Sequence, residues 1–276
     1  MLTDKQIHFY RDQGYLLLEK FYSVEELMPI YTGIKKLIDL IRKKNNLPFL
    51  SFDKNNITFD NFDDGFLELA SFNRKEASLV YDIVKYIPEF INLSSSLKNK
   101  KLYEALSGSR LCGYAGSGNG IRIDLPYEDK FLYSWHQDFP YQLRSLDGIV
   151  FWSPLKYLTY ENGPLEIAAR SHKQGVMKLY YEGFNENKGY NLKIKNIDSY
   201  LTKYEIIKPL LEPGDLLVFN FCAIHKSGYN YSKKSRWSMQ FRYFNFLDEF
   251  GIKNNWAGGY ATGRSIENVL PHLFLD

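Results

Sequence analysis

The segment EPGDLLVFNFCAIHKSGYNYSKKSR, residues 212–236, carries the strongest indication of the fold. Its Pro-Gly pair favours a turn, and the apolar run that follows is typical of a buried strand. We expect this strand to cover 215–224 and to end at His225, with every second side chain from position 217 on the face of His225. A polar turn then leads to Arg236, which opens another β-like run. The segment predicts a hairpin in an antiparallel sheet.

Short β-like runs of the same kind occupy most of the chain after Arg110. The clearest cover 148–152, 165–168 and 237–246, and turn residues such as Asn162-Gly163 separate them. This texture is typical of an antiparallel β-barrel or a double-sheet jelly roll.

Helical signals dominate the first third of the chain instead. Thr3 with Gln6 and Ser23 with Glu26 form capping boxes, the sequence signature of a helix start. Apolar residues recur at helical spacing after the second box, up to a basic triplet at 42–44 that suits a last turn. We expect a short strand between the two helices, a loop over 45–65, and more helix from 74 to 106, interrupted at Pro88.

The order of these elements predicts a mainly β protein with flanking helices, an α+β arrangement. We expect one domain over 1–276, with a helix-rich part at about 1–108 and a β core at about 109–250. We see no internal repeat and no convincing linker in the sequence.

Composition narrows the class of protein. The chain has 276 residues, 45% of them hydrophobic, and a net charge of +3, an excess too small to indicate nucleic-acid binding. Its apolar runs are too short for a membrane span, and its N-terminus does not resemble a signal peptide. Two cysteines without CxxC spacing argue against a disulfide framework. We expect a cytoplasmic protein that binds neither nucleic acid nor membrane.

The segment YSWHQD, residues 133–138, holds a candidate pair of metal ligands. In a strand, positions i and i+2 point to one face, so His136 and Asp138 project together. An imidazole and a carboxylate are two of the three ligands in a two-His, one-carboxylate iron site. Taken alone, the triplet also fits an ordinary hydrogen-bonded pair.

The segment 212–236 holds a candidate for the third metal ligand and candidates for residues that bind a small diacid. Arg236 lies eleven residues after His225, across the expected hairpin, so both side chains can reach one cavity. Arginine offers a planar fork for a carboxylate, and the Ser227 hydroxyl can add a hydrogen bond. Alone, His225 fits a structural histidine and Arg236 a solvated charge. Their order behind His136 and Asp138 favours a metal site with a diacid anchor.

In these motifs the chain resembles the phytanoyl-CoA dioxygenase family of Fe(II)/2-oxoglutarate oxygenases. The resemblance covers nearly the whole chain. Its pieces are LTDKQIHFYRDQGYLLLEKFYSVEEL (2–27), WHQD (135–138), ENGPL (161–165), SHKQG (171–175), EPGDLLVF (212–219) and HKSGYNYSKKSR (225–236).

The resemblance implies a double-stranded β-helix core, of jelly-roll or cupin-like type. It implies Fe(II) bound by His136, Asp138 and His225, and 2-oxoglutarate bound by Arg236 and Ser227. Trp152 falls where the family often lines the co-substrate pocket. The implied reaction uses O2 to hydroxylate a small-molecule substrate and releases succinate and CO2. The substrate and the oligomeric state stay open.

Other activities stay open beside hydroxylation. Related halogenases lack the carboxylate ligand, so Asp138 favours hydroxylation, whereas desaturation and ring formation use the same ligands. A cupin-like metal enzyme without 2-oxoglutarate does not need Arg236. A binding or sensory protein that has lost turnover is a third alternative.

The chain departs from the family pattern just before SHKQG. Ala169-Arg170 stands where the family commonly has Pro-Gly, and Arg170 faces either substrate or solvent. We interpret His172 as structural. Arg122 is a candidate for binding an anion or for a salt bridge. Specificity is expected to depend on the segments 45–65, 176–205 and 254–264.

Overall fold

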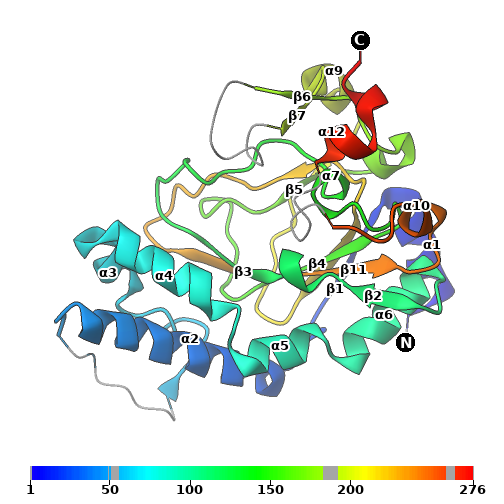
Figure 1. Cartoon of the computed structure of the whole chain (residues 1–276). Helices are drawn as coiled ribbons and strands as arrows, with labels where there is room; N and C mark the ends of the chain where they lie inside the picture. The colour runs from blue at the N-terminus through cyan, green and yellow to red at the C-terminus, as the bar shows by residue number, and fades with distance from the viewer. Residues whose placement is uncertain (1, 49, 51–55, 183–191, 259–264, 276) are drawn as a thin grey trace.

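The computed structural model describes residues 2–48, 50, 56–182, 192–258 and 265–275 (Figure 1). Helices precede most strands, as predicted. In the N-terminal part these are α1 (Asp4–Gln13), α2 (Val24–Lys44), α3 (Phe66–Phe72), α4 (Arg74–Val84), α5 (Pro88–Ser94) and α6 (Leu97–Ser107). Shorter ones follow: η2 (Gly116–Gly118), α7 (Phe139–Gln142), η3 (Ser171–Gln174), α9 (Ile197–Leu201), α10 (Glu249–Lys253), α12 (Ile266–Val269) and η4 (Pro271–Leu273).

Within the described residues, three antiparallel sheets form the β part. The main sheet has the order β1 (Tyr15–Leu18), β9 (Leu216–Asn220), β4 (Ile149–Pro154), β11 (Arg236–Asn245), β2 (Cys112–Tyr114), and β3 (Gly120–Asp124) also pairs with β11. The second sheet has the order β10 (His225–Lys226), β5 (Glu166–Ala168), β8 (Ile206–Ile207). The third pairs β6 (Leu179–Tyr181) with β7 (Leu192–Ile194). This is the β-rich α+β, cupin-like fold that was predicted.

The longest strand, β11, divides the interior in two. Alternate residues of a strand point to opposite faces. Its apolar set lies in the core that β11 shares with the helices: Trp237, Met239, Phe241 and Tyr243. Its polar set lies on the opposite face, which we call the inner face: Arg236, Ser238, Gln240 and Arg242. A second apolar core forms on the inner side, between the main sheet and the second sheet.

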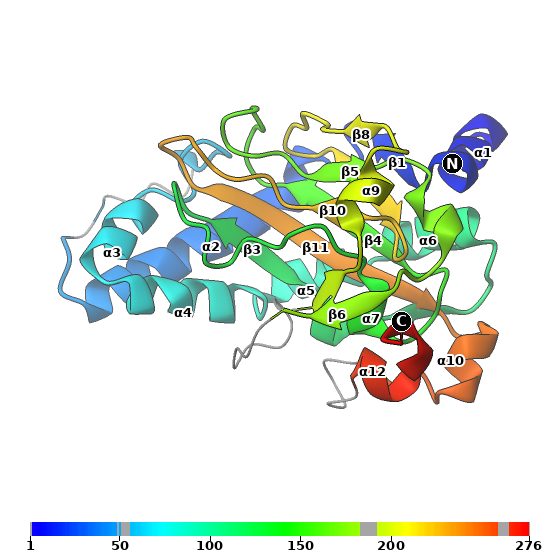
Figure 2. The ribbon, with the colours of Figure 1, turned by 90° about the horizontal axis from the view of Figure 1, so that it is seen from above.

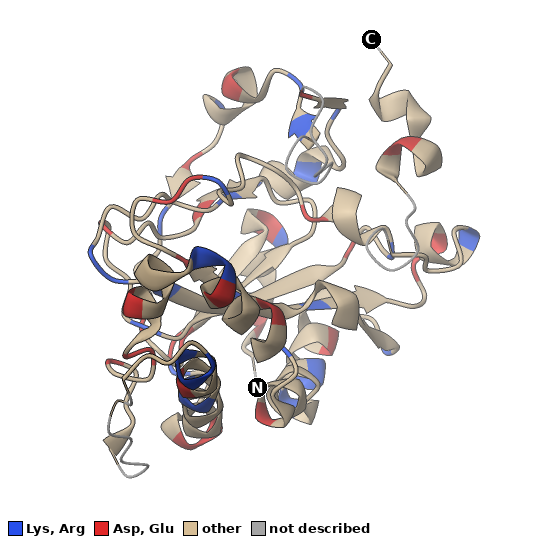
Figure 3. Cartoon of the chain, turned by 60° about the vertical axis from the view of Figure 1, so that its left-hand side comes forward, with Lys and Arg blue, Asp and Glu red and all other residues tan. Residues whose placement is uncertain are grey.

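The helices α2, α5 and α6 run along the outer side of the main sheet (Figures 1 and 2). Ile30, Ile34 and Ile38 of α2 are fully buried in the same core as the apolar residues of β11. Acidic and basic residues are interspersed on the helices of this layer (Figure 3), and Lys44 of α2 pairs with Glu76 of α4 at 2.8 Å. Among the described helices, none combines the length and hydropathy needed to cross a membrane.

Most of the predicted helices and strands are confirmed. Both capping boxes are present, at Thr3 and Ser23, and the basic triplet closes α2. The predicted helix from 74 to 106 is divided into three helices, and Pro88 stands at the start of the middle one. The described residues of the 45–65 loop form turns, and the rest of that segment lies outside the described residues. Helix α3 was not predicted.

The strand predicted over 215–224 is wrong in its second half. Strand β9 ends at Asn220, whose carbonyl accepts from the Ala223 amide and whose side chain accepts from the Cys222 amide. The chain turns there and enters the second sheet, so His225 begins β10 instead of ending β9. Residues 221–224 are buried throughout, and an uninterrupted apolar run does not distinguish a buried turn from a strand.

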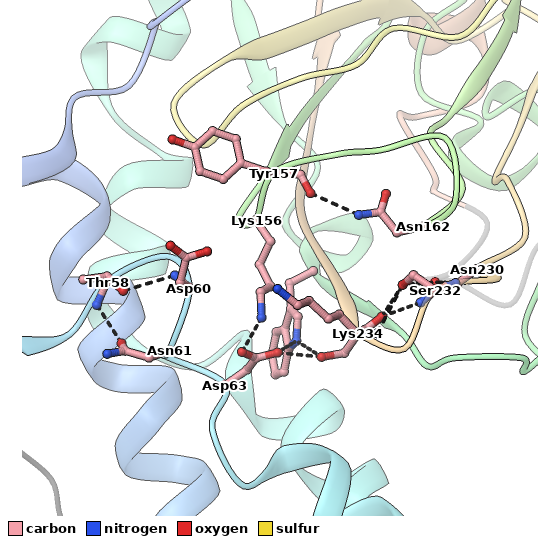
Figure 4. Close-up of polar contacts among 12 residues, drawn as sticks. Thr58, Asp60, Asn61, Asp63, Lys156, Tyr157, Asn162, Asn230, Ser232 and Lys234 are labelled. Atoms are coloured by element: carbon pink, nitrogen blue, oxygen red, sulfur yellow. Dashed lines mark hydrogen bonds and ion pairs between the residues drawn. The ribbon is translucent and has the colours of Figure 1, made fainter.

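A buried carboxylate joins the helical layer to the main sheet (Figure 4). Asp63, just before α3, accepts hydrogen bonds from Lys156 Nζ at 2.5 Å, Ser235 Oγ at 2.6 Å and Trp237 Nε1 at 3.0 Å. The Trp237 ring packs edge-on against Phe66. Three donors from two distant segments therefore converge on one side chain, which orients the start of β11.

We predict that Asp63→Ala lowers the free energy of unfolding by about 3–5 kcal/mol, because it removes the acceptor of the largely buried Lys156 ammonium and of the buried Ser235 hydroxyl. Trp237 Nε1 keeps Ser235 Oγ as an acceptor at 3.0 Å. Asp63→Asn should cost less, since its amide oxygen still accepts. Asp60→Ala, an exposed change in the same loop, is the control and should stay within about 0.5 kcal/mol. Urea denaturation measures all three, and equal losses for Asp63→Ala and Asp60→Ala would contradict this role for Asp63.

Candidate metal centre

Two histidines face each other across a single β-bridge. The amide of His136 donates to the carbonyl of His225 and the amide of His225 donates back to His136, both at 2.9 Å. Residues paired in this way project their side chains to the same face. The two imidazole rings lie with their centroids 4.2 Å apart. The bridge thus brings together two histidines that are far apart in the sequence.

Hydrogen bonds from both rings leave the same nitrogen of each available. Nδ1 of His136 lies 2.8 Å from the carbonyl of Ser134, and Nδ1 of His225 lies 3.0 Å from the carbonyl of Ala223. A carbonyl only accepts, so each Nδ1 carries the proton and each Nε2 keeps its lone pair. Such bonds orient the imidazoles that bind metal ions in proteins.

The third member of the cluster is Asp138. Its Oδ1 lies 3.6 Å from Nε2 of His136 and 3.6 Å from Nε2 of His225. One ligand atom of each residue, all within 4.8 Å of one another, can meet on one ion. Asp138 was predicted to lie in a strand. It instead directly precedes the short helix α7, which contains Pro140. The three side chains converge, although the local structure at Asp138 differs from the predicted strand.

Gln137 fixes the backbone between the two ligand candidates of this segment. Its buried amide nitrogen donates to the carbonyls of Gly175 and Cys222, and its oxygen accepts from the Met177 amide. The side chain between His136 and Asp138 is therefore held on the opposite side, and the two ligand candidates keep their direction.

His225 and Asp138 are in the protonation states that bind a cation. Burial lowers the pKa of His225 to about 3, and the neighbouring His136 acts in the same direction. Burial acts to raise the pKa of Asp138, but Arg242 and the two histidines outweigh it and keep the pKa well below its usual range. At neutral pH, His225 is neutral and Asp138 is ionised.

A cavity of about 330 Å³ opens over these three residues. Its apolar walls come from Val150, Trp152, Leu165 and Phe219, and its polar lining includes Ser227, Gln240 and Arg242. Tyr81 of α4, Lys85 directly after that helix and the segment 117–122 complete the lining. The helical layer therefore contributes to the mouth of the cavity.

Arg236 lies buried beside this cavity, on the inner face of β11. Its Nε donates to Asp124 Oδ2 at 3.2 Å, its Nη2 lies 2.8 Å from the same oxygen in an ion pair, and its Nη1 donates to the carbonyl of Gly228 at 3.3 Å. A guanidinium has five N–H donors, so two remain without a partner among the described residues. The next inner-face residue, Ser238, has a buried hydroxyl without a partner in that same part of the chain. These donors fit a carboxylate.

Asp124 balances two arginines at once. Arg122 Nη2 approaches its Oδ1 at 2.7 Å while Arg236 holds its Oδ2. Burial acts to raise the pKa of Asp124, but the two guanidinium groups outweigh it and lower the pKa. Two positive charges against one carboxylate leave this part of the inner face cationic, which suits an anionic ligand.

The structure brings together most of the residues predicted for the site. His136, Asp138 and His225 converge, and Trp152 and Ser227 line the cavity. Arg236 is not part of that lining, but it donates to the carbonyl of Gly228, the residue after Ser227. Arg242, which contacts Asp138, was not predicted to belong to the site. Its signal is in the sequence RWSMQFR at 236–242, where polar residues alternate from Arg236 onward and share its face of the strand.

Several other expectations are settled by contacts. Arg170 forms an exposed ion pair with Asp12 at 2.7 Å, and His172 lies 3.1 Å from the carbonyl of Arg11, outside the metal cluster. Arg122 forms the salt bridge with Asp124 and also lines the cavity. The described residues of 45–65, 176–205 and 254–264 are not among the cavity lining. Positions 49, 51–55, 183–191 and 259–264 lie outside the described residues.

Two imidazoles and one carboxylate, with one side left open, are the donor set that suits non-haem Fe(II). The unpaired donors of Arg236 and Ser238 fit a second, anionic ligand beside that ion. The residues therefore fit both iron and a co-substrate with a carboxylate.

Comparison with known proteins agrees with this arrangement. The model of the phytanoyl-CoA dioxygenase (PhyH) family matches residues 10–238. A phytanoyl-CoA dioxygenase domain-containing protein 1 homolog from Dictyostelium discoideum is 24% identical over 258 residues, covering 85% of this chain and 88% of the relative. A phytanoyl-CoA dioxygenase from Arabidopsis thaliana is 24% identical over 254 residues, covering 85% and 86%.

The fold is also found among solved structures. EctD from S. alaskensis, crystallised with 2-oxoglutarate and 5-hydroxyectoine, superposes with a TM-score of 0.60 at 15% identity, over 96% of this chain and 84% of EctD. The match to the family model spans most of the chain and includes all three members of the metal cluster. The chain therefore belongs to the phytanoyl-CoA dioxygenase family of Fe(II)/2-oxoglutarate-dependent oxygenases.

Proposed function

We propose that this protein uses Fe(II), O2 and 2-oxoglutarate to hydroxylate a small-molecule substrate, releasing succinate and CO2. The observation that carries the proposal is the convergence of His136, Asp138 and His225 beside a buried arginine with unused donors. A metal enzyme that does not bind a diacid has no need of such an arginine beside its cavity.

In this proposal Nε2 of His136, Nε2 of His225 and one oxygen of Asp138 hold the iron. When bound, the iron and 2-oxoglutarate together supply the oxidising power for attack on a C–H bond. The backbone carbonyls of Ser134 and Ala223 keep the imidazoles in the ligating tautomer.

Arg236 and Ser227 would hold the distal carboxylate of 2-oxoglutarate. Arg236 cannot swing away, because Asp124 and the Gly228 carbonyl hold three of its donors. Asp124 in turn faces two arginines, so a further carboxylate at Arg236 does not meet an unbalanced negative charge. Trp152 would form a wall of this subsite, where its apolar face excludes water.

The substrate would enter from the side lined by α4. Tyr81, Lys85 and Asn119 give this mouth a polar character, whereas Val150 and Phe219 make the wall near the metal cluster apolar. Such a cavity suits a small molecule with polar groups at the mouth and a C–H bond at the metal. Asp138 occupies the ligand position that a halide would need, which supports hydroxylation over halogenation.

The first prediction concerns the ternary chelate. Anaerobic addition of Fe(II) and 2-oxoglutarate to the purified protein should produce the weak visible charge-transfer band of the chelate. His225→Ala should abolish the band because one of the three ligands is lost. Arg236→Lys should raise the 2-oxoglutarate concentration needed for half-formation by about tenfold or more, since a bidentate fork becomes a point charge.

His8→Ala is the matched control for His225→Ala. The His8 ring is bonded to the Asp4 carbonyl on the exposed face of α1, so the band should persist unchanged. Absence of the band in folded, iron-loaded wild-type protein would refute the use of 2-oxoglutarate.

The second prediction concerns turnover. With Fe(II), ascorbate, O2 and 2-oxoglutarate but no substrate, the wild-type protein should form succinate slowly, because the co-substrate can be oxidised without a partner. Asp138→Ala and His225→Ala should reduce the rate to that of free iron. Succinate measured by mass spectrometry provides the readout. Adding the true substrate should raise the rate and yield one hydroxylated product per succinate.

A wild-type protein that forms the chelate band but no succinate, with any compound of a broad substrate panel, would favour a binding or sensory role.

A further inference from the structure

We propose that Arg242 is a positioning residue that restricts Asp138 to one ligating oxygen and thereby keeps a coordination position open at the metal. The inference rests on the proposed function, because it assumes that the cluster binds iron. It assigns a role to the arginine of the inner face that the binding of 2-oxoglutarate does not use.

The two oxygens of Asp138 face different partners. Oδ1 lies 3.6 Å from Nε2 of each histidine, on the side where the ion would sit. Oδ2 instead accepts a hydrogen bond from Nε of Arg242 at 2.6 Å. Both side chains are shielded, with 5% of Asp138 and 13% of Arg242 exposed. A charge-assisted bond of this length in a buried site is strong.

Arg242 is itself held on several sides. Its Nη2 donates to Oε1 of Gln240 at 3.0 Å, and its Nη1 donates to the carbonyl of Gly118. Its backbone amide donates to Oδ1 of Asn119 at 2.8 Å, and its carbonyl accepts from the Ala115 amide at 2.9 Å. The guanidinium therefore has a fixed direction before any ion binds, which is the requirement for a positioning residue.

The consequence concerns the number of open positions. A carboxylate binds a metal ion through one oxygen or through both. Two imidazoles and one carboxylate oxygen would leave open positions at the ion for 2-oxoglutarate and O2. A second oxygen of Asp138 would compete for one of these positions. By engaging Oδ2, Arg242 prevents that competition.

The two arginines at the ends of the polar row on β11 thus have separate tasks. Arg236 is held by Asp124 and keeps donors available for a diacid, whereas the Nε of Arg242 donates to Asp138. Their spacing of six residues places both on the inner face of one strand, where Arg242 lines the cavity and Arg236 contacts Gly228, which follows the lining residue Ser227.

The test compares Arg242→Gln and Arg242→Lys with wild type in binding Co(II), a spectroscopic substitute for Fe(II), and then 2-oxoglutarate. We expect Arg242→Gln to change the visible absorption of the Co(II) protein, because Asp138 gains a second binding mode. We expect its 2-oxoglutarate affinity to fall by about 10–100-fold. Arg242→Lys keeps a cation near Oδ2 and should recover part of the affinity.

Arg144→Gln is the matched control. Arg144 is also a buried arginine and also holds the segment beside the cavity, through Ser117 Oγ at 3.2 Å. Within the described residues its hydrogen bonds go to Gln142 and Ser117 and not to Asp138. This variant should keep the wild-type spectrum and affinity. Losses equal to those of Arg242→Gln would overturn the proposal, since they would show that any loosening of this segment is sufficient.

A second comparison applies if Arg242→Gln does not fold. In an Asp138→Ala background, Arg242→Lys should cause no further change in Co(II) binding, because the oxygen it positions is gone. An undiminished effect in that background would overturn the proposal, as would a wild-type Co(II) spectrum and 2-oxoglutarate affinity in Arg242→Lys and Arg242→Gln. A wild-type protein without the iron chelate band would instead remove the proposed function itself.

Discussion

The reciprocal backbone hydrogen bonds between His136 and His225 are the constraint on which the site depends. One histidine precedes a short helix and the other opens a strand of the second sheet, so no local pattern relates them. The bridge sets the distance and the common direction of the two rings. The carbonyls of Ser134 and Ala223 then set their tautomers, and Asp138 completes the cluster within the same segment as His136.

Burying so many charges requires that each is matched. A buried ion pair gains little net stability, because desolvation offsets most of the attraction, whereas a buried charge without its partner is costly. On the inner face, Asp124 forms ion pairs with Arg122 and Arg236, and Asp138 forms an ion pair with Arg242. These pairs are better explained by what they hold in place than by stability. Each orients a group that faces the cavity, and together they leave the region receptive to an anion.

The helical layer has two roles, one in supporting the main sheet and one in lining the cavity. Its apolar faces cover the outer side of the main sheet, and Asp63 ties the loop before α3 to the start of β11. The same layer brings Tyr81 and Lys85 to the mouth of the cavity. A rigid β11 fixes Arg236 and Arg242, while the helices that support it contribute the side chains that a substrate would meet first.

The sequence alone determined where the first helices begin and which residue types form the candidate metal site. Capping boxes at Thr3 and Ser23 specify helix starts because the bonds are local. The residue types at 136, 138 and 225 indicate a candidate iron site, because few residue sets suit an iron ion with open coordination positions. The position of the turn after Asn220, the pairing of Arg242 with Asp138 and the approach of α4 to the cavity were decided only by the tertiary structure. A buried turn has the same apolar composition as a buried strand, and an arginine's partner depends on contacts between segments over a hundred residues apart. Such contacts follow from packing, which no local pattern of residues encodes.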